Sequence, residues 1–276
     1  MSQFFKRFPF KLQTALTLLL LAGALTACGP DKKDAKKELT TEEYDYRAAL
    51  QNYKIGINHL GNKEYIRAIE HLKLAIEGDA NNWRYHHGLG MAYSLHGQLG
   101  EAEKSLNQAL VINPNSSETH NLLGSIYVDL KKYEEAVGHF KKVIMDKSYP
   151  QPEFPYFNLG LCRIQQGRDE EAIAAFGRVI QIAPEFYRAY VAIGDIYRDR
   201  NEYQKALFYY QKAETGFNDN VTILFEIGRA MFKLKQFDKA KSYLAQVSIL
   251  FPPPNIDKPT QDMLRYIEKY QREARN

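Results

Sequence analysis

The sequence has few of the residues that support catalysis, metal binding or crosslinking. It contains only two cysteines in 276 residues, too few for a disulfide framework or a zinc site of spaced cysteines. It has no glycine-rich phosphate-binding loop and no His-Glu-x-x-His helix. We therefore predict that this chain is not an enzyme and that it holds neither a metal nor a cofactor.

An excess of charge of one sign is also missing. The net charge of +4 comes mostly from residues 1–27, which contain Lys6, Arg7 and Lys11 and no acidic residue. Without that segment, 37 − 3 = 34 basic residues stand against 33 acidic ones, a balance of +1. This offers no electrostatic basis for nucleic-acid binding, and no motif indicates a small-molecule substrate.

The apolar run near the N-terminus is too short to span a membrane. It extends over 14 residues, from Leu12 to Leu25, whereas a spanning helix needs roughly 20. Basic residues precede it and the small residues Thr26-Ala27 follow it, so residues 1–27 are predicted to be a cleaved secretory signal. A plain transmembrane anchor is the alternative.

The end of this segment, Leu25-Thr26-Ala27-Cys28, resembles the bacterial lipobox. The resemblance implies that Cys28 is lipidated and becomes the first residue of the mature protein, with acyl chains that hold it on a bilayer. Gly29 rather than Asp follows the cysteine. By resemblance to Gram-negative lipoproteins, this implies an outer-membrane protein that faces the periplasm. The charged residues 28–43 are predicted to be a flexible tether, and Cys162 is predicted to pack as a small apolar group.

Small residues recur at a fixed interval through the rest of the chain. Six glycines are separated by 34, 34, 36, 34 and 34 residues, each is followed 12 residues later by an alanine, and a bulky apolar residue lies four further on. Small side chains at two fixed phases predict close crossings of paired antiparallel helices. The glycines are Gly56, Gly90, Gly124, Gly160, Gly194 and Gly228, and the alanines are Ala68, Ala102, Ala136, Ala172, Ala206 and Ala240.

This pattern resembles the tetratricopeptide (TPR) repeat, in which each unit is a helix A followed by a helix B. The resemblance implies an all-α fold, a right-handed TPR superhelix of six repeats over residues 44–254. We number repeat positions so that the glycine is position 8 and the alanine is position 20. Pro114, Pro184 and Pro252 at position 32 predict helix ends. Residues 255–276 are predicted to form a capping helix with Pro259 in its first turn.

By analogy with the repeat family, positions 2, 5, 9 and 12 of the A helices face a concave groove. A groove that is partly apolar and partly polar is suited to a segment of a protein partner. The alternative is that some of these residues only cover the cleft. The predicted partner-binding residues are Leu50, Tyr53, Ile57, Arg84, His87, Met91, Asn121 and Ser125.

The interval of 36 residues falls between repeats three and four. Pro150, Pro152 and Pro155 lie there within six residues, a density that predicts an extended connection rather than helix. This stretch, continuing to Asn158-Leu159-Gly160-Leu161-Cys162, resembles the type IV pilus TPR lipoproteins called PilF, PilW or Tgl. Asp169 departs from the pattern, because an aromatic residue or leucine precedes the alanine by three in the other five repeats.

The resemblance implies a pilotin, a lipoprotein that binds secretin (PilQ-like) subunits and promotes their outer-membrane targeting and multimerisation for type IV pilus biogenesis. A second possibility is a general periplasm-facing TPR scaffold that organises cell-wall hydrolases or outer-membrane assembly factors.

Overall fold

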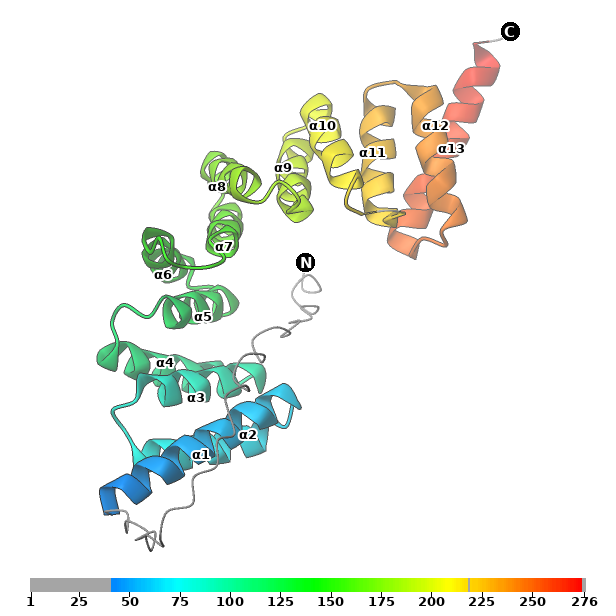
Figure 1. Cartoon of the computed structure of the whole chain (residues 1–276). Helices are drawn as coiled ribbons and strands as arrows, with labels where there is room; N and C mark the ends of the chain where they lie inside the picture. Colours follow the sequence, from blue (N-terminus) through cyan, green and yellow to red (C-terminus); the bar gives the residue numbers. More distant parts are fainter. Residues whose placement is uncertain (1–40, 218, 275–276) are drawn as a thin grey trace, which may run out of the picture. The chain divides into compact units, whose positions relative to one another are not determined.

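The computed structural model describes residues 41–217 and 219–274 (Figure 1). The predicted signal segment, Cys28 and residues 28–40 of the predicted tether lie outside this range. Residues 40–276 form one compact unit. Its helices are α1 (Thr41–Gly61), α2 (Tyr65–Gly78), α3 (Trp83–Leu95), α4 (Leu99–Ile112), α5 (Ser117–Asp129), α6 (Tyr133–Met145), α7 (Glu153–Gln165), α8 (Asp169–Ile182), α9 (Tyr187–Asp199), α10 (Tyr203–Glu214), α11 (Val221–Lys233), α12 (Phe237–Ile249) and α13 (Pro254–Glu273).

The first twelve helices form the six predicted pairs. The odd-numbered helices α1 to α11 are the A helices and the even-numbered helices α2 to α12 are the B helices. Each helix packs against the next one in the chain, and the A helices of repeats one to four also contact one another in sequence. Helix α1 begins at Thr41, slightly before the start of the repeats expected at residue 44.

The six glycines lie where the two helices of each repeat cross. A Cβ atom added to Gly124 would lie 2.7 Å from Cε1 of Phe140, and one added to Gly160 would lie 2.5 Å from Cε1 of Phe176. Real Cβ atoms do not approach other heavy atoms so closely, so only glycine lets the large residue of helix B reach helix A. The pairs are Gly56 with Leu72, Gly90 with Leu106, Gly124 with Phe140, Gly160 with Phe176, Gly194 with Tyr210 and Gly228 with Leu244.

The turn between helices A and B has the same geometry in every repeat. Position 15 has a positive φ, and its N–H donates to the carbonyl of position 12, while the N–H of position 16 donates to the carbonyl of position 11. These two hydrogen bonds form a Schellman motif. Glycine is the usual residue at the left-handed position of this motif, but only two of the six residues are glycine. The six are Lys63, Gly97, Lys131, Gly167, Asn201 and Lys235.

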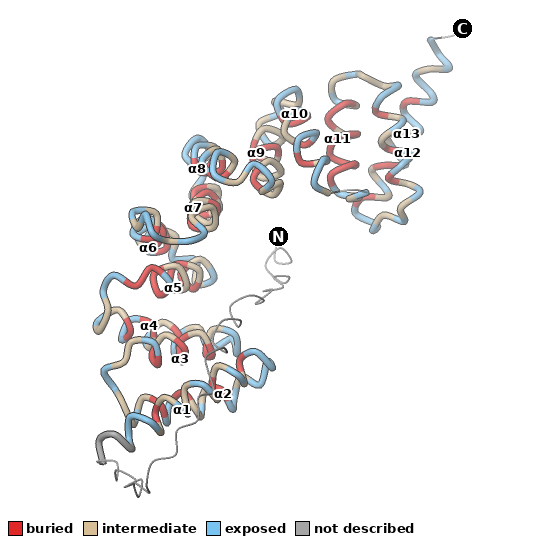
Figure 2. Tube along the Cα trace, in the orientation of Figure 1, coloured by how far each residue is buried: buried red, intermediate tan, exposed pale blue. Residues whose placement is uncertain are grey.

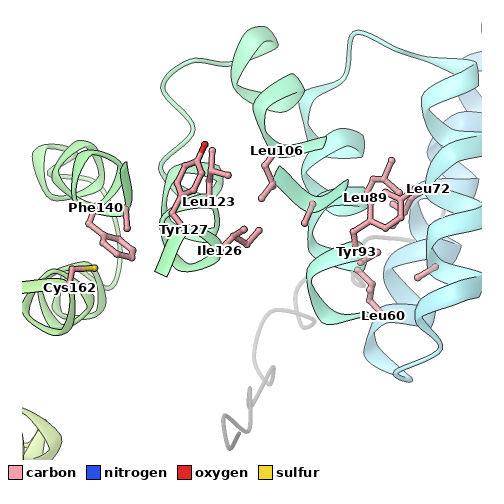
Figure 3. Packing of buried hydrophobic residues seen from close by; sticks show 14 of the residues in the cluster. Leu60, Leu72, Leu89, Tyr93, Leu106, Leu123, Ile126, Tyr127, Phe140 and Cys162 are labelled. Atoms are coloured by element: carbon pink, nitrogen blue, oxygen red, sulfur yellow. The ribbon is translucent and has the colours of Figure 1, made fainter. Parts of the chain in front are cut away.

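The core lies between successive helices and consists of four clusters of buried residues along the array; Figure 2 marks the buried positions in red. Figure 3 shows its N-terminal part, in which Leu72, Leu106 and Phe140 lie between the helices of repeats one to three. Cys162 belongs to this cluster and is a fully buried free thiol, as predicted. Burial raises the pKa of its thiol to about 12, so the sulfur is unreactive at neutral pH.

The proline-rich junction is less extended than predicted. Helix α7 begins at Glu153 and includes Pro155, so the prediction that proline excludes helix there was wrong. Pro155 is the third residue of α7, where its missing N–H would have had no partner within the helix. The residues before α7 form turns: the N–H of Tyr149 donates to the carbonyl of Asp146, and Pro152 itself has helical angles.

Repeat four replaces an aromatic contact with ion pairs. Position 11 is Arg163 in place of the tyrosine found in repeats two, three and five, and its side chain is buried. Its Nε lies 3.0 Å from Oε2 of Glu171. Asp169, the residue that departs from the pattern, accepts from Nε of Arg200 in repeat five at 3.1 Å. The departure noted in the sequence is thus a charged junction between repeats.

Helix α13 packs against α12 and α11 at the C-terminal end of the repeats, and its role as a cap stays a prediction. Ile256, Thr260 and Ile267 are its buried residues. Pro254 occupies the first turn, and Pro259 lies one turn later inside the helix, which corrects the position predicted for Pro259. The residue in register with the glycines is the exposed Asp262, so α13 offers no crossing point for a further B helix.

Candidate protein-binding face

We define the A-helix face as the surface formed by positions 2, 5, 9 and 12 of the A helices. The predicted partner-binding residues come from three of these helices. Leu50, Tyr53 and Ile57 lie on α1, Arg84, His87 and Met91 on α3, and Asn121 and Ser125 on α5. All eight are partly or fully exposed, and none is buried in the core. Whether they bind a partner stays a prediction.

Tyr53 and Ile57 pack beside the neighbouring A helix. A Cβ on Gly88 would lie at ordinary van der Waals distances from this pair, 3.4 Å from Cε2 of Tyr53 and 3.5 Å from Cδ1 of Ile57, so α3 packs directly against this part of α1. The Tyr53 ring lies 5.0 Å from the ring of Tyr85, which is fully buried. Burial raises the pKa of the Tyr53 hydroxyl. This part of the A-helix face is therefore apolar with a neutral hydroxyl at its edge.

The side chains of α3 add a polar section. His87 Nδ1 lies 3.0 Å from the Thr119 hydroxyl on α5 and so joins repeats two and three. Burial lowers the pKa of His87, so the ring is neutral at pH 7. The Arg84 guanidinium lies 4.8 Å from the centre of the Trp83 ring and remains exposed. A permanent positive charge thus borders the apolar section.

On α5 the face carries an amide and a hydroxyl. The Ser125 hydroxyl donates to the backbone carbonyl of Asn121 at 3.1 Å. The Asn121 Oδ1 atom is buried and has no hydrogen-bond partner in the described structure. A buried amide oxygen without a partner costs free energy.

Repeats five and six contain a charged network that was not predicted from the sequence. Arg198 Nη1 contacts Oδ1 of Asp195 and lies 3.4 Å from Oε1 of Glu226, and the Tyr210 hydroxyl donates to Asp195 Oδ1 at 2.7 Å. Burial raises the pKa of both carboxyl groups, and Arg198 and Arg229 oppose that shift. Asp195 and Arg198 occupy positions 9 and 12, so the same register rule would have found them had it been applied to repeat five.

Two histidines at the same repeat position, His86 and His120, contact backbone carbonyls. His86 Nε2 lies 2.9 Å from the carbonyl of Ala80, and His120 Nε2 lies 2.9 Å from that of Pro114, so both rings close equivalent turns as core residues. His120 Nδ1 also lies 2.8 Å from Nδ1 of His139. Within residues 41–217 and 219–274, no three His, Cys, Asp or Glu side chains are placed to hold a metal ion.

Two further surface features bear on the site. Shallow hollows lie around Ile66, between α2 and the turn from α3 to α4, and none of the predicted binding residues lines them. No helix in the described part of the chain combines the length and apolar character that crossing a membrane requires.

Comparison with known proteins identifies the repeats. Models of the tetratricopeptide repeat match residues 59–126, 117–145, 154–186 and 197–257, which together exceed half of the chain. The chain is a tetratricopeptide repeat protein. The predicted all-α TPR superhelix of six repeats is thereby confirmed.

This TPR protein is similar to proteins of type IV pilus biogenesis. It is 25% identical over 240 residues to the type IV pilus assembly protein PilF of Pseudomonas aeruginosa, an alignment that covers 86% of this chain and 94% of PilF. A solved structure of Pseudomonas aeruginosa PilF matches with a TM-score of 0.68 at 22% identity, over 79% of this chain and 99% of that one. PilW, described as a widely conserved type IV pilus biogenesis factor, matches with a TM-score of 0.65 at 22% identity, over 79% and 97% of the two chains. The resemblance to the PilF and PilW family is confirmed.

Proposed function

We propose that this TPR protein is a pilotin, a lipid-anchored outer-membrane protein that binds secretin subunits and promotes their targeting and multimerisation for type IV pilus biogenesis. The observation that carries the proposal is the similarity to PilF, which extends over nearly the whole of both chains rather than over a few repeats. In this proposal the protein acts by binding and not by catalysis.

In the proposed mechanism three parts of the chain serve as a membrane anchor, a tether and a binding face. Acyl chains on Cys28 supply membrane affinity. Residues 29–40 would supply a reach of about 40 Å if fully extended. The A-helix face would hold the secretin segment, and tethering raises the local concentration of captured subunits, which favours their assembly.

The early part of the A-helix face suits an apolar partner segment with hydrogen-bonding groups. Tyr53, Ile57 and Met91 offer partly exposed apolar surface, and Asn121 and Ser125 are partly exposed polar residues beside it. An amphipathic segment would bury its apolar side chains on the former and could donate to the latter. Arg84 at the edge would favour an acidic residue in the partner.

Deletion of the gene and complementation test the proposal. We expect the deletion to abolish heat-resistant secretin multimers in membrane fractions and to abolish piliation. Complementation by the wild-type gene should restore both, whereas an Ile57→Glu, Met91→Glu double variant should restore neither. The control is Ile66→Glu, an equally drastic change at an exposed position on helix B of repeat one.

Two outcomes would contradict the proposal. Secretin multimers and piliation that are unchanged by the deletion would exclude a pilotin. Capture of cell-wall hydrolases or outer-membrane assembly factors in place of a secretin, from detergent extracts, would favour the general scaffold instead.

A further inference from the structure

The corner between α12 and α13 presents large apolar side chains to water. Phe251 is 94% exposed and Ile249 is 73% exposed. Exposed aromatic side chains of this size are uncommon at a helix connection, because burying a phenylalanine contributes about 2 kcal/mol or more. Val111 and Met145 are exposed to a similar extent as Ile249 at the ends of other B helices, so Phe251 is what distinguishes this corner.

The backbone holds Phe251 in this position. Its φ is +50°, the left-handed region, which costs an L-residue about 1 to 2 kcal/mol. Pro252, Pro253 and Pro254 follow directly, and Pro253 has φ −65° and ψ 157°, the polyproline II conformation. Three prolines leave little conformational freedom, so the Phe-Pro-Pro-Pro segment is stiff before it meets any partner.

The other end of the same helical pair carries a cluster of aromatic rings. We define the terminal aromatic cluster as Phe232, Phe237, Tyr266 and Tyr270. The Phe237 and Tyr270 rings lie 4.7 Å apart, and those of Phe232 and Tyr266 lie 5.3 Å apart. Tyr266 is 53% exposed and Tyr270 is 48% exposed, so about half of each of these two side chains remains open to solvent.

These two features are chemically complementary. Because the Phe-Pro-Pro-Pro corner is stiff, its exposed Phe251 ring would lose little entropy on docking, and aromatic rings pack favourably against one another. The corner and the terminal aromatic cluster of one molecule cannot contact each other. Sixteen residues of α13 separate Pro254 from Tyr270, which places the corner and the cluster about 24 Å apart along a rigid helix.

We propose that this TPR protein forms a homodimer in which the Phe-Pro-Pro-Pro corner of each protomer docks on the terminal aromatic cluster of the other. Under two-fold symmetry each contact is made twice. Both corners and both aromatic clusters are then occupied, so the assembly closes as a dimer and does not extend into a larger oligomer. Two contacts about 24 Å apart match the width of an interface of ordinary size. The dimer does not depend on the pilotin function.

Sedimentation velocity on residues 40–276, which form a compact unit by themselves, tests the proposal. We expect a dimer at high micromolar concentration. Phe251→Ser should weaken it by about tenfold or more, the usual effect of truncating an aromatic anchor. Val111→Ser is the matched control, because Val111 is an apolar side chain that is 72% exposed at the end of another B helix, and it should leave the dimer intact.

A peptide of residues 248–255 supplies a second measurement that does not depend on a folded variant. It should compete with the dimer and bind wild-type protein, while the same peptide with serine in place of Phe251 should do neither. Tyr270→Ser should abolish peptide binding while circular dichroism stays unchanged. A protein that is monomeric at every concentration, a dimer insensitive to Phe251→Ser, or a dimer lost equally with Val111→Ser would overturn the proposal.

Discussion

The helix crossing in repeat three allows a test in which one substitution has opposite effects at two sites. Gly124 and Gly138 both lie in the middle of helices, α5 and α6. Replacing either by alanine gains about 1 kcal/mol of helix propensity. Only at Gly124 does the new methyl group meet a neighbour, since a Cβ on Gly138 would have nothing within 4 Å.

The size of the clash can be worked from the contact distances. A Cβ at Gly124 would lie 2.7 Å from Cε1 and 3.0 Å from both Cδ1 and Cζ of Phe140. Carbon atoms pack at about 3.5 to 4.0 Å, so the ring would have to move by about 1 Å. The Phe140 ring is fully buried and cannot move freely, and overpacking of this kind costs about 1 to 3 kcal/mol.

Urea unfolding followed by far-ultraviolet circular dichroism measures the effect. Gly138→Ala should raise the free energy of unfolding. That of Gly124→Ala should be about 1 to 3 kcal/mol lower than that of Gly138→Ala, because both variants gain the same helix propensity and only Gly124→Ala introduces a clash. Repeat arrays can unfold in stages, so hydrogen exchange of the α5 and α6 amides should locate the loss in repeat three.

The same geometry ranks the other crossings. Gly160→Ala should be at least as costly, because three Phe176 ring atoms would lie within 2.8 Å, whereas Gly228→Ala meets Leu244 at 2.9 Å and should cost less. Equal midpoints for Gly124→Ala and Gly138→Ala would refute the assignment of these glycines to helix crossings.

Three further predictions concern the anchor, a turn and a half-buried histidine. Cys28→Ser should leave the repeats folded but move the protein into the soluble periplasmic fraction, and membrane retention would contradict the anchor. Lys131→Gly should stabilise the protein by about 1 kcal/mol in urea unfolding, since Lys131 has φ +59° and glycine carries no penalty there, whereas Lys132→Gly should not. Burial lowers the pKa of His139 to about 4, below the unfolded value, so its contribution to stability is present above about pH 6.5 and is lost as pH falls towards 4. His139→Gln should flatten the decline in melting temperature over that window, and an unchanged slope would contradict it; His96→Gln, at an exposed ring, should leave it unchanged.

The A-helix face could be predicted in outline but not in its energetics. The repeat register alone assigned Tyr53, His87 and Ser125 to positions 5 and 9 of the A helices, because the glycines mark position 8 of every A helix. It did not show that His87 bonds Thr119 or that Asn121 Oδ1 lacks a partner. Such contacts depend on the distance between neighbouring repeats, which no single helix encodes.

The sequence by itself determined the repeat architecture, because a small residue every 34 or 36 positions is a direct record of where helices cross. Local chemistry was enough for this, since a methyl group at those points would already clash. The tertiary structure alone decided the rest. Lysine or asparagine occupies the left-handed turn position in four repeats, where packing of the flanking helices overrides the local preference for glycine. The charged junctions of repeats four to six likewise join residues about thirty positions apart, and only stacking of the repeats brings them together.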